Sequence, residues 1–229
     1  MEKYDYIICG GGASGLLRSN AFIKDEFFND KKILIIERES KTLNDKTFSF
    51  WDNQSNVLDR IVFKSWEKAE FIDSEFSSSF NLSPYKYKMV RSDRFYSYMR
   101  GKIDRASNFN YLNATVIDID KDSNQNNVKT DHGDFLCSVV FSSIYEPKKY
   151  DFKKYPLLNQ HFLGWTIETE NDFFDENKIR FMDFSIEQHQ ETRFMYVLPF
   201  SKNSALFEYT FFGGDIMKTL NMKRKLRST

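Results

Sequence analysis

The stretch YDYIICGGGASGLLRSNAFIKDEFFNDKKILIIE, residues 4–37, decides the fold of this chain. It opens with an apolar run at 4–9 that ends in three glycines. Apolar residues at helical spacing follow, and a second apolar run fills 31–37. Strands buried on both faces of a parallel sheet read as continuous apolar runs. The stretch therefore predicts a strand, a helix and a second, parallel strand.

The glycines between the first strand and the helix have a spacing that suits a dinucleotide. Gly10 permits a sharp turn, Gly12 lets the backbone approach a pyrophosphate, and Gly15 lets helix and strand pack closely. The helix N-terminus adds free N–H groups and a partial positive charge. The predicted cofactor contacts are Gly10, Gly11, Gly12, Ala13, Ser14, Gly15 and Glu37.

Glu37 ends the second strand, roughly 20 residues after the glycines, where a dinucleotide-binding unit carries an acid for the ribose. Its carboxylate would repel a 2′-phosphate, which argues against NADP at this site. A glycine motif this close to the N-terminus is typical of FAD enzymes, so FAD is favoured over NAD. The structural alternative is an ordinary glycine turn in an α/β sheet.

The rest of the chain predicts one helix and a series of strands. Ser92–Ile103 has helical spacing, with Ser92 or Asp93 as its cap. Strands are predicted at 116–119 and 138–144, with a polar loop at 122–127 and a hairpin turn at 131–133. Four more strands are predicted at 163–169, 179–184, 192–198 and 204–212.

These elements predict an α/β fold: a Rossmann-like FAD-binding domain with an antiparallel sheet of the aromatic-hydroxylase type. We place the FAD domain at residues 1–145 and expect it to be discontinuous, with residues 1–45 and parts of 85–145 belonging together and its C-terminal part missing. A β-rich substrate region follows at 146–212, and an atypical basic tail at 213–229.

Bulk composition excludes several classes of function. The chain has 229 residues, with 33 basic and 33 acidic side chains, so no net charge directs it to nucleic acid. Its two cysteines are far apart and indicate neither a metal site nor a disulfide framework. No apolar run approaches the roughly 18 residues that span a bilayer. We expect a cytoplasmic protein whose membrane contact is peripheral.

Aromatic residues make up 17% of the chain, which leaves two interpretations open. One is an apolar pocket for an apolar substrate. The other is the codon bias of an AT-rich genome, which enriches Phe, Tyr, Lys, Asn and Ile together.

Five segments, in order along the chain, carry a resemblance to one family. They are NDKTFSFW at 44–51, QHFLGW at 160–165, FMDF at 181–184, RFMYVLPF at 193–200 and ALFEYT at 205–210. Together with the glycine motif they resemble the flavin-dependent lycopene cyclases, which close β-ionone rings in carotenoid biosynthesis. The resemblance covers about residues 4–212.

The resemblance implies a β-cyclase reaction with no net redox change, on lycopene or a related linear carotenoid. An acid protonates the terminal double bond, a neighbouring double bond attacks the cation, and loss of a proton leaves the ring. In this family FAD must be reduced, with NAD(P)H as the electron donor, yet it is not consumed. A reduced, anionic flavin would stabilise the developing positive charge.

Glu208 is the predicted catalytic acid. It lies in an apolar strand, where desolvation would keep a carboxyl group protonated. It also matches the first position of the Glu-acidic-Thr signature of the family, although this chain has Tyr209 at the second position. The alternative from spacing alone is a solvent-facing residue on an alternating strand.

Further site residues are proposed from their type and place. Trp51 and Trp165, together with Phe48 and Phe50, could line a polyene tunnel and stabilise a cation, whereas core packing is the alternative for each. Arg91, before the predicted helix, is a flavin contact by analogy with related flavoproteins; a surface arginine is the alternative.

The resemblance stops near residue 212, and the tail is rich in Lys and Arg. We therefore expect a lycopene cyclase that is truncated at its C-terminus. A frameshift or premature stop, a split gene, and a basic end that touches anionic lipid are the three explanations. An FAD-dependent isoprenoid oxidoreductase of the same fold, and an inactive remnant, stay open as alternatives.

Overall fold

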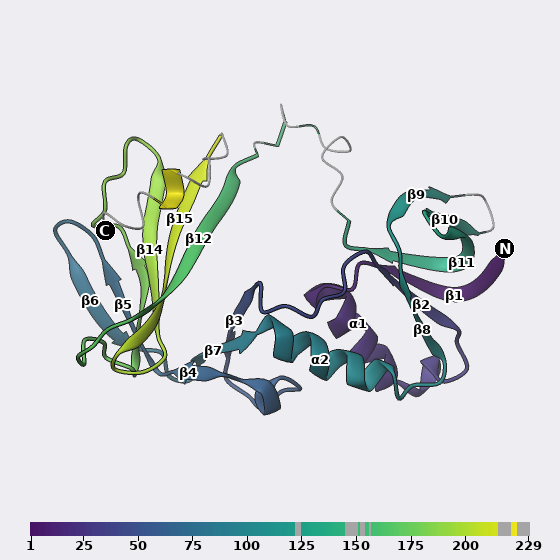
Figure 1. Ribbon diagram of the computed structural model, residues 1–229, viewed down its shortest axis with the longest axis horizontal. Helices are drawn as coiled ribbons and strands as arrows, with labels where there is room; N and C mark the ends of the chain where they lie inside the picture. Colours follow the sequence, from purple (N-terminus) through teal and green to yellow (C-terminus); the bar gives the residue numbers. More distant parts are fainter. Residues whose placement is uncertain (122–124, 145–150, 152–153, 156, 215–220, 224–229) are drawn as a thin grey trace. The chain divides into compact units, whose positions relative to one another are not determined.

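The computed structural model describes residues 1–121, 125–144, 151, 154–155, 157–214 and 221–223. The chain divides into two compact units (Figure 1). Unit 1 consists of Met1–Phe48 and Val90–Pro147, and unit 2 consists of Ser49–Met89 and Lys148–Thr229.

Unit 1 is built on a six-stranded sheet in the order β8-β2-β1-β11-β10-β9. The strands β8, β2, β1 and β11 are parallel, whereas β11, β10 and β9 form an antiparallel meander. The bounds are β1 (Glu2–Cys9), β2 (Ile33–Glu37), β8 (Phe109–Asn113), β9 (Val116–Lys121), β10 (Asn126–Thr130) and β11 (Gly133–Ser142). The parallel part, with its helices, is the Rossmann-like unit that the sequence predicts.

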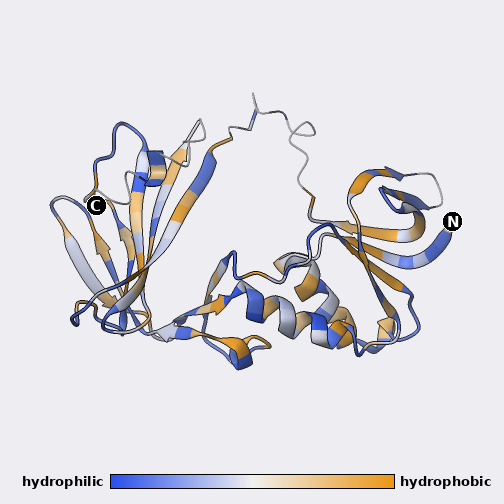
Figure 2. Cartoon of the chain, viewed as in Figure 1, coloured by the Kyte–Doolittle hydropathy of each residue, from blue (hydrophilic) through white to orange (hydrophobic). Residues whose placement is uncertain are grey.

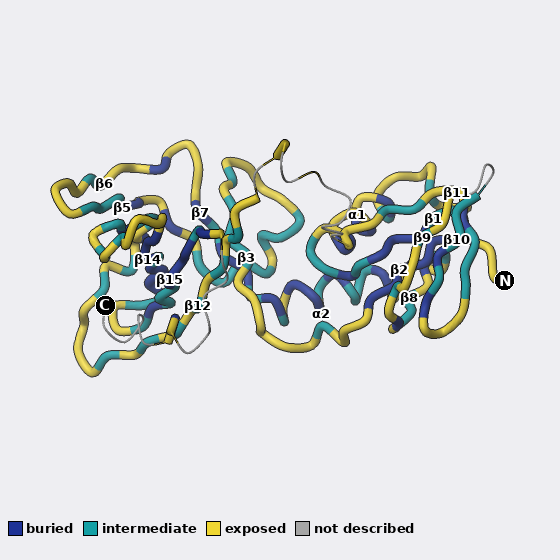
Figure 3. Tube along the Cα trace, turned by 90° about the horizontal axis from the view of Figure 1, so that it is seen from above, coloured by how far each residue is buried: buried dark blue, intermediate teal, exposed yellow. Residues whose placement is uncertain are grey.

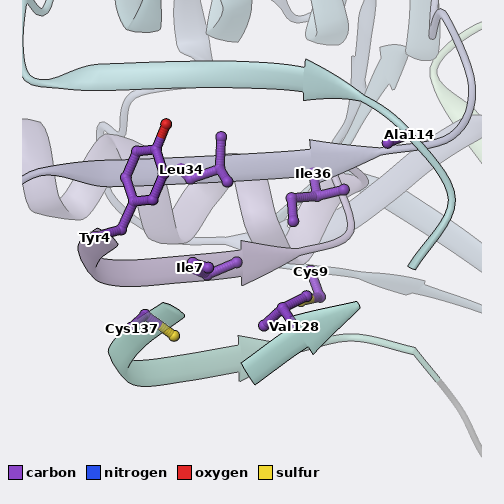
Figure 4. Packing of buried hydrophobic residues seen from close by; sticks show 8 residues of the cluster. All are labelled: Tyr4, Ile7, Cys9, Leu34, Ile36, Ala114, Val128 and Cys137. Carbon is purple, nitrogen blue, oxygen red and sulfur yellow. The ribbon is translucent and has the colours of Figure 1, made fainter. Parts of the chain in front are cut away.

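The two faces of this sheet are filled by alternate residues of the same strands. Ile7 and Cys9 of β1 join Leu34 and Ile36 of β2 in one buried cluster with Val128 (Figure 4). The opposite face of β1 packs against the helix α1, as the 5.6 Å between the Tyr6 ring and the Phe22 ring of α1 shows. Burial on both sides explains why both strands read as continuous apolar runs.

Two α-helices belong to unit 1, α1 (Ala13–Ile23) and α2 (Ser92–Ile103), and they pack against each other. The predicted bounds of α2 are confirmed. The predicted cap is wrong, because the N-cap residue is Arg91. Ser92 instead is fully buried, and its Oγ donates to the Leu43 carbonyl at 3.1 Å and accepts the Lys46 N–H at 3.0 Å.

The meander differs from the prediction in one place. Asn126 and Asn127 belong to β10, so the predicted polar loop is shorter than 122–127, and residues 122–124 lie outside the described part of the chain. The predicted hairpin turn is confirmed. It joins β10 to β11, with Gly133 at a φ of 117° that favours glycine.

Unit 2 contains a six-stranded sheet in the order β12-β15-β14-β13-β5-β6. Every pair in it is antiparallel except β13 and β5, which run parallel. The bounds are β5 (Lys68–Ile72), β6 (Ser77–Asn81), β12 (Asn159–Glu168), β13 (Lys178–Asp183), β14 (Thr192–Pro199) and β15 (Ser204–Gly213). The central strands β14 and β15 are the most buried, and β6 at the edge is exposed (Figure 3).

A smaller sheet has the order β3-β7-β4, from β3 (Thr47–Asp52), β7 (Lys86–Arg91) and β4 (Lys64–Trp66). Two short 3-10 helices, η1 (Glu26–Phe28) and η2 (Asp59–Ile61), complete the described elements. Hydrophobic residues gather along the central strands of the sheets and hydrophilic ones in the connecting loops (Figure 2).

Unit 1 contains the two pieces, residues 1–45 and most of 85–145, that were expected to form the discontinuous FAD domain. Residues 49–89 between them belong to unit 2. These residues join unit 2 because their strand β5 hydrogen-bonds to β13, which is far away in the sequence. Of the tail, Met222 is buried against Met195, Tyr209 and Phe211.

Candidate functional site

The turn between β1 and α1 can be built only with glycine at two of its positions. Gly10 has a φ of 108°, and a Cβ on it would lie 2.1 Å from Ser143 Oγ. A Cβ on Gly15 would lie 1.9 Å from the Gly10 carbonyl oxygen, which is a backbone atom that cannot move aside. Gly15 therefore sets how closely α1 approaches the strand.

The open side of the turn is at Gly12. A Cβ there would meet nothing within 4 Å, so the backbone is bare at the start of α1. No side chain caps this helix, and Ala13, Ser14 and Gly15 begin its first turn. Uncapped N–H groups and the helix dipole favour a phosphate at this place. The residues present thus fit the pyrophosphate of a dinucleotide.

Glu37 ties the end of β2 to the glycine turn. It is 8% exposed, and its Oε2 accepts the Gly11 N–H at 2.7 Å. Its Oε1 accepts the Glu39 N–H at 3.0 Å and lies 3.8 Å from Lys41 Nζ. A carboxylate oxygen can accept two hydrogen bonds, so Glu37 keeps acceptor capacity for ribose hydroxyls.

Two residues beside this turn were missed by the sequence analysis. The Tyr111 hydroxyl lies 2.5 Å from the position of a Cβ on Gly11, and the Arg100 guanidinium carbon lies 3.4 Å from the centre of the Tyr111 ring. Burial raises the pKa of Tyr111, and Arg100 opposes that shift. Tyr111 reaches Gly11 because β8 pairs with β2, a pairing that no local motif signals.

Arg91 is the last residue of β7 and the N-cap of α2, and it is partly buried. Its role as a flavin contact stays a prediction.

In unit 2, Glu208 lies near the middle of β15, on the same face as Leu206 and Thr210. It is partly buried, and burial raises the pKa of its carboxyl group to about 7, against a smaller opposite effect of a hydrogen bond with Thr210. Glu208 is therefore neither fully exposed nor fully buried, and its role as the acid stays a prediction. Near neutral pH a substantial fraction of this carboxyl group carries a proton.

The strand register defines what flanks Glu208. Directly opposite it lie Gly164 on β12 and Tyr196 on β14. A Cβ on Gly164 would be 3.8 Å from Glu208 Oε2, so the missing side chain leaves space beside the carboxyl group. Phe162 and Thr166 of β12 share this face and are exposed. Glu208 thus lies next to an open, partly apolar strip of the sheet.

An aromatic cluster extends from Tyr196, the residue opposite Glu208 on β14. Tyr196 hydrogen-bonds through its hydroxyl to that of Tyr87, and its ring lies 5.8 Å from that of Phe181. The Trp51 ring lies 4.7 Å from that of Tyr87 and 5.4 Å from that of Phe181. Phe181 and Tyr196 lie in segments that carry the family resemblance, but only the tertiary structure brings them together.

Two of the aromatic residues predicted to line a tunnel lie elsewhere. Trp165 is opposite Phe207, so alternation puts it on the other face of the sheet from Glu208. Phe48 belongs to unit 1, where its ring packs 5.2 Å from that of Phe95. Trp165 packs against the cluster of Met195, Tyr209 and Phe211, and Phe48 against Phe95, as the packing alternative has it; the substrate role of Trp165 stays a prediction.

Tyr209, the departure from the family signature, also faces away from Glu208. It is buried, and its hydroxyl accepts a hydrogen bond from Arg193 Nη1 at 3.3 Å. Since neighbouring residues of a strand point to opposite faces, this position has no direct part in the surroundings of Glu208. The departure leaves the candidate acid unaffected.

Comparisons with solved structures define the class of the fold. A p-nitrophenol 4-monooxygenase from Pseudomonas putida DLL-E4 matches all of this chain with 14% identity and a TM-score of 0.65. A geranylgeranyl bacteriochlorophyll reductase-like protein from Thermoplasma acidophilum matches all of it with 14% identity and a TM-score of 0.66. A flavin-dependent brominase matches 91% of it with 14% identity and a TM-score of 0.65. The fold is that of this class of flavoprotein enzymes.

The chain covers 62%, 61% and 56%, respectively, of the lengths of these three proteins. Its family is defined by sequence: the family described as "Lycopene cyclase protein" matches residues 5–229, and the chain belongs to it. The matched range includes 213–229, which the sequence analysis set apart. A comparison with curated proteins found no match.

Two further findings concern only the described residues. Among them, no helix is long and apolar enough to cross a membrane. They also contain no group of three or more His, Cys, Asp or Glu residues arranged to hold a metal ion.

Proposed function

We propose that this chain is a lycopene β-cyclase, or the N-terminal part of one, with Glu208 as the proton donor. The observation that carries the proposal is a partly buried carboxyl group, flanked by Gly164 and Tyr196, whose pKa burial raises to about 7. A general acid works best when its pKa lies near the working pH. Membership of the lycopene cyclase family supplies the substrate class.

Glu208 donates its proton to the terminal double bond of the carotenoid end group. The bond from Oε to hydrogen breaks, a C–H bond forms, and positive charge appears on the adjacent carbon. Attack by the neighbouring double bond closes the ring. A ring proton then passes to a base, either the Glu208 carboxylate left by the first step or a water molecule, which gives the β-ionone product. Trp51 and Phe181 present ring faces that stabilise the positive charge.

The glycine turn and Glu37 would hold the FAD, with its pyrophosphate at the start of α1 and its ribose at Glu37. When bound and kept reduced by NAD(P)H, FAD supplies negative charge that stabilises the cation, without being consumed. A carotenoid dissolves in the bilayer, which supports the proposal of a peripheral membrane contact on the cytoplasmic side; the proposed reaction involves no nucleic acid.

The competing proposal is an FAD-dependent isoprenoid oxidoreductase of the same fold. The fold likeness to a geranylgeranyl bacteriochlorophyll reductase-like protein favours it. The two proposals differ in flavin chemistry, because an oxidoreductase changes the redox state of its flavin in each turnover and a cyclase does not. Absorption spectra of the flavin during turnover separate them.

The test of the proposal is carotenoid analysis of lycopene-accumulating cells that express the chain alone, or together with a related C-terminal half. We expect Glu208→Gln to lower ring formation by roughly 10²- to 10⁴-fold, the usual range for a lost general acid, and to retain FAD. Cyclisation at the wild-type rate by Glu208→Gln would refute the proposal. Purified protein that neither holds FAD nor gains thermal stability from it would indicate an inactive remnant.

A further inference from the structure

Exposed apolar side chains are concentrated at the start of β12. Four large ones lie within residues 155–162 of unit 2: Tyr155, Leu157, Leu158 and Phe162, which are 60%, 46%, 66% and 57% exposed. Elsewhere in the described part of the chain, no stretch of eight residues has more than two such side chains. Single exposed apolar residues are normal on a soluble protein, whereas a group of them marks a contact surface. We call these four residues the β12 patch.

Positive charge lies directly before the β12 patch. Residues 148–154 of the sequence, KKYDFKK, contain four lysines and one acid. Of these lysines the structure describes Lys154, which is exposed and whose Nζ lies 5.2 Å from the centre of the Tyr155 ring. Lysines beside exposed aromatic and leucine side chains are typical of segments that bind the surface of an anionic membrane.

A lipid surface fits the β12 patch better than a second copy of this chain does. The strand β12 ends its sheet, so one of its edges has no neighbouring strand among the described residues (Figure 1). Two copies paired through this edge would place the same surface on both sides of a symmetric interface. The lysines of both copies would then meet, and such like-charge contacts cost free energy. The same lysines are attracted to anionic lipid.

We propose that the β12 patch is the surface through which this protein binds a lipid bilayer that contains anionic lipid. Leu157 and Leu158 enter the boundary between the headgroups and the acyl chains. Tyr155 lies at the level of the headgroups, where an aromatic ring with a polar end is favoured. Lys154 keeps its ammonium group in water next to the lipid phosphates.

The β12 patch ends on the face of the sheet that carries Glu208. In the pairing of β12 with β15, Phe162 is opposite Thr210, and Gly164 is opposite Glu208. Alternation along the strands puts Phe162, Gly164 and Glu208 on one face. An apolar substrate dissolved in the bilayer would therefore approach the acid along β12, a consequence that rests on the proposed function.

Co-sedimentation of the full chain with lipid vesicles tests the proposal. One kind of vesicle is phosphatidylcholine alone, and the other has equal parts of phosphatidylcholine and phosphatidylglycerol. The leucine variant combines Leu157→Ser with Leu158→Ser, two side chains that together expose about as much surface as one whole leucine. Its partition into both kinds of vesicle should fall by about tenfold.

Lys154→Gln tests the electrostatic part of the contact. One lysine near an anionic surface contributes enough attraction that its loss should lower binding to the phosphatidylglycerol vesicles by about fivefold. Binding to phosphatidylcholine alone should stay unchanged, because those vesicles carry no net charge. An equal loss on both kinds of vesicle would contradict the placement of Lys154 at lipid phosphates.

Phe173→Ser is the matched control for the leucine variant. Phe173 is 77% exposed and belongs to the same unit, but its neighbours in the sequence, Asp172 and Asp175, are acidic. We expect its vesicle binding to stay within about twofold of the wild type, since a single exposed apolar residue marks no surface. All of these variants should unfold at the wild-type temperature, because the changed side chains are exposed.

Vesicle binding by the leucine variant that equals that of Phe173→Ser would overturn the proposal. So would a wild type that binds no vesicles and forms dimers in sedimentation velocity that the leucine variant does not form, because the patch would then bind a second copy. These assays contain neither carotenoid nor FAD. A chain that binds vesicles through the β12 patch but forms no rings contradicts only the proposed function.

Discussion

The glycine turn of unit 1 and the Glu208 strand of unit 2 achieve their chemistry in opposite ways. At Gly10–Gly15 the site exists because side chains are absent, and the backbone itself supplies the N–H groups. At Glu208 the site exists because three strands and several aromatic rings surround one carboxyl group and raise its pKa.

This difference determines how each site responds to a substitution. A methyl group on Gly15 meets the Gly10 backbone, which cannot move aside. Glu208 is flanked by Gly164 and by the Tyr196 side chain, so a substitution beside it changes its pKa gradually. The predictions below separate these two kinds of dependence.

The largest effect is expected at the turn, with Gly15→Ala. The new Cβ would lie 1.9 Å from the Gly10 carbonyl oxygen, so α1 must move away from the sheet. Overpacking of this kind costs about 3 kcal/mol. Urea unfolding measures the loss.

Gly12→Ala is the matched control for that change. Its Cβ meets nothing within 4 Å, so the free energy of unfolding should fall by less than about 1 kcal/mol, the cost of alanine at an N-cap. The methyl group occupies the open side of the turn, and FAD affinity measured by fluorescence should drop. Equal loss of stability in both variants would contradict the assignment of Gly12 to the cofactor side.

The second prediction concerns stability as a function of pH. The folded state holds the Glu208 pKa at about 7, above the value of 4.5 for a free carboxyl group. The free energy of unfolding should therefore fall as the pH rises from about 4.5 to about 7. Glu208→Gln should therefore be more stable than the wild type by roughly 3 kcal/mol near pH 9, since each pKa unit corresponds to 1.36 kcal/mol.

Below about pH 4 the difference should vanish, because the carboxyl group is protonated in both the folded and the unfolded state. Denaturation curves at several pH values measure it. A wild type that is more stable than Glu208→Gln at high pH would indicate a carboxylate stabilised by folding, in contradiction to a buried acid.

A third, smaller effect should distinguish the two tryptophans. Trp165→Ala removes a ring from the cluster around Tyr209, so we expect about 2 kcal/mol of lost stability, below the range for a fully buried tryptophan. Trp51 is 44% exposed beside Tyr87, so Trp51→Ala should cost less stability and weaken carotenoid binding more. Thermal unfolding and quenching of protein fluorescence by carotenoid report the two quantities. If one of the two variants lost more of both stability and carotenoid binding than the other, the different surroundings assigned to the two tryptophans would be contradicted.

The smallest effect is expected from Gly164→Ala. The methyl group would lie 3.8 Å from Glu208 Oε2 and 3.1 Å from Leu206 Cδ1, the mobile end of a side chain. It removes space for water beside the carboxyl group, and desolvation should raise the Glu208 pKa by a few tenths of a unit. Infrared titration detects this; a fall in the pKa would show that Gly164 does not border the acid.

Much of unit 1 could be predicted because its signals are local. The glycine turn, α2 and the hairpin at Gly133 each depend on residues a few positions apart. Tyr111 was missed because it reaches Gly11 through the pairing of β8 with β2, and the cap of α2 was misplaced because Ser92 holds a distant loop.

For unit 2 the sequence predicted the strands and the acid but not the set of residues around it. Alternation along β15 places Glu208 on one face, yet which face is buried depends on partners that are far apart in sequence, such as Tyr87 and Phe181. The sequence likewise did not show that Trp165, paired with Phe207, lies on the opposite face of the sheet from Glu208.

The sequence by itself therefore determined a dinucleotide turn, because glycine spacing and helix polarity act over a few residues. It also determined which carboxyl group in an apolar strand is a candidate acid. Only the tertiary structure decided that β5 pairs with β13 and that Tyr196, opposite Glu208, hydrogen-bonds to Tyr87. Strand pairing over long separations places those side chains, and such pairing is a property of the whole fold.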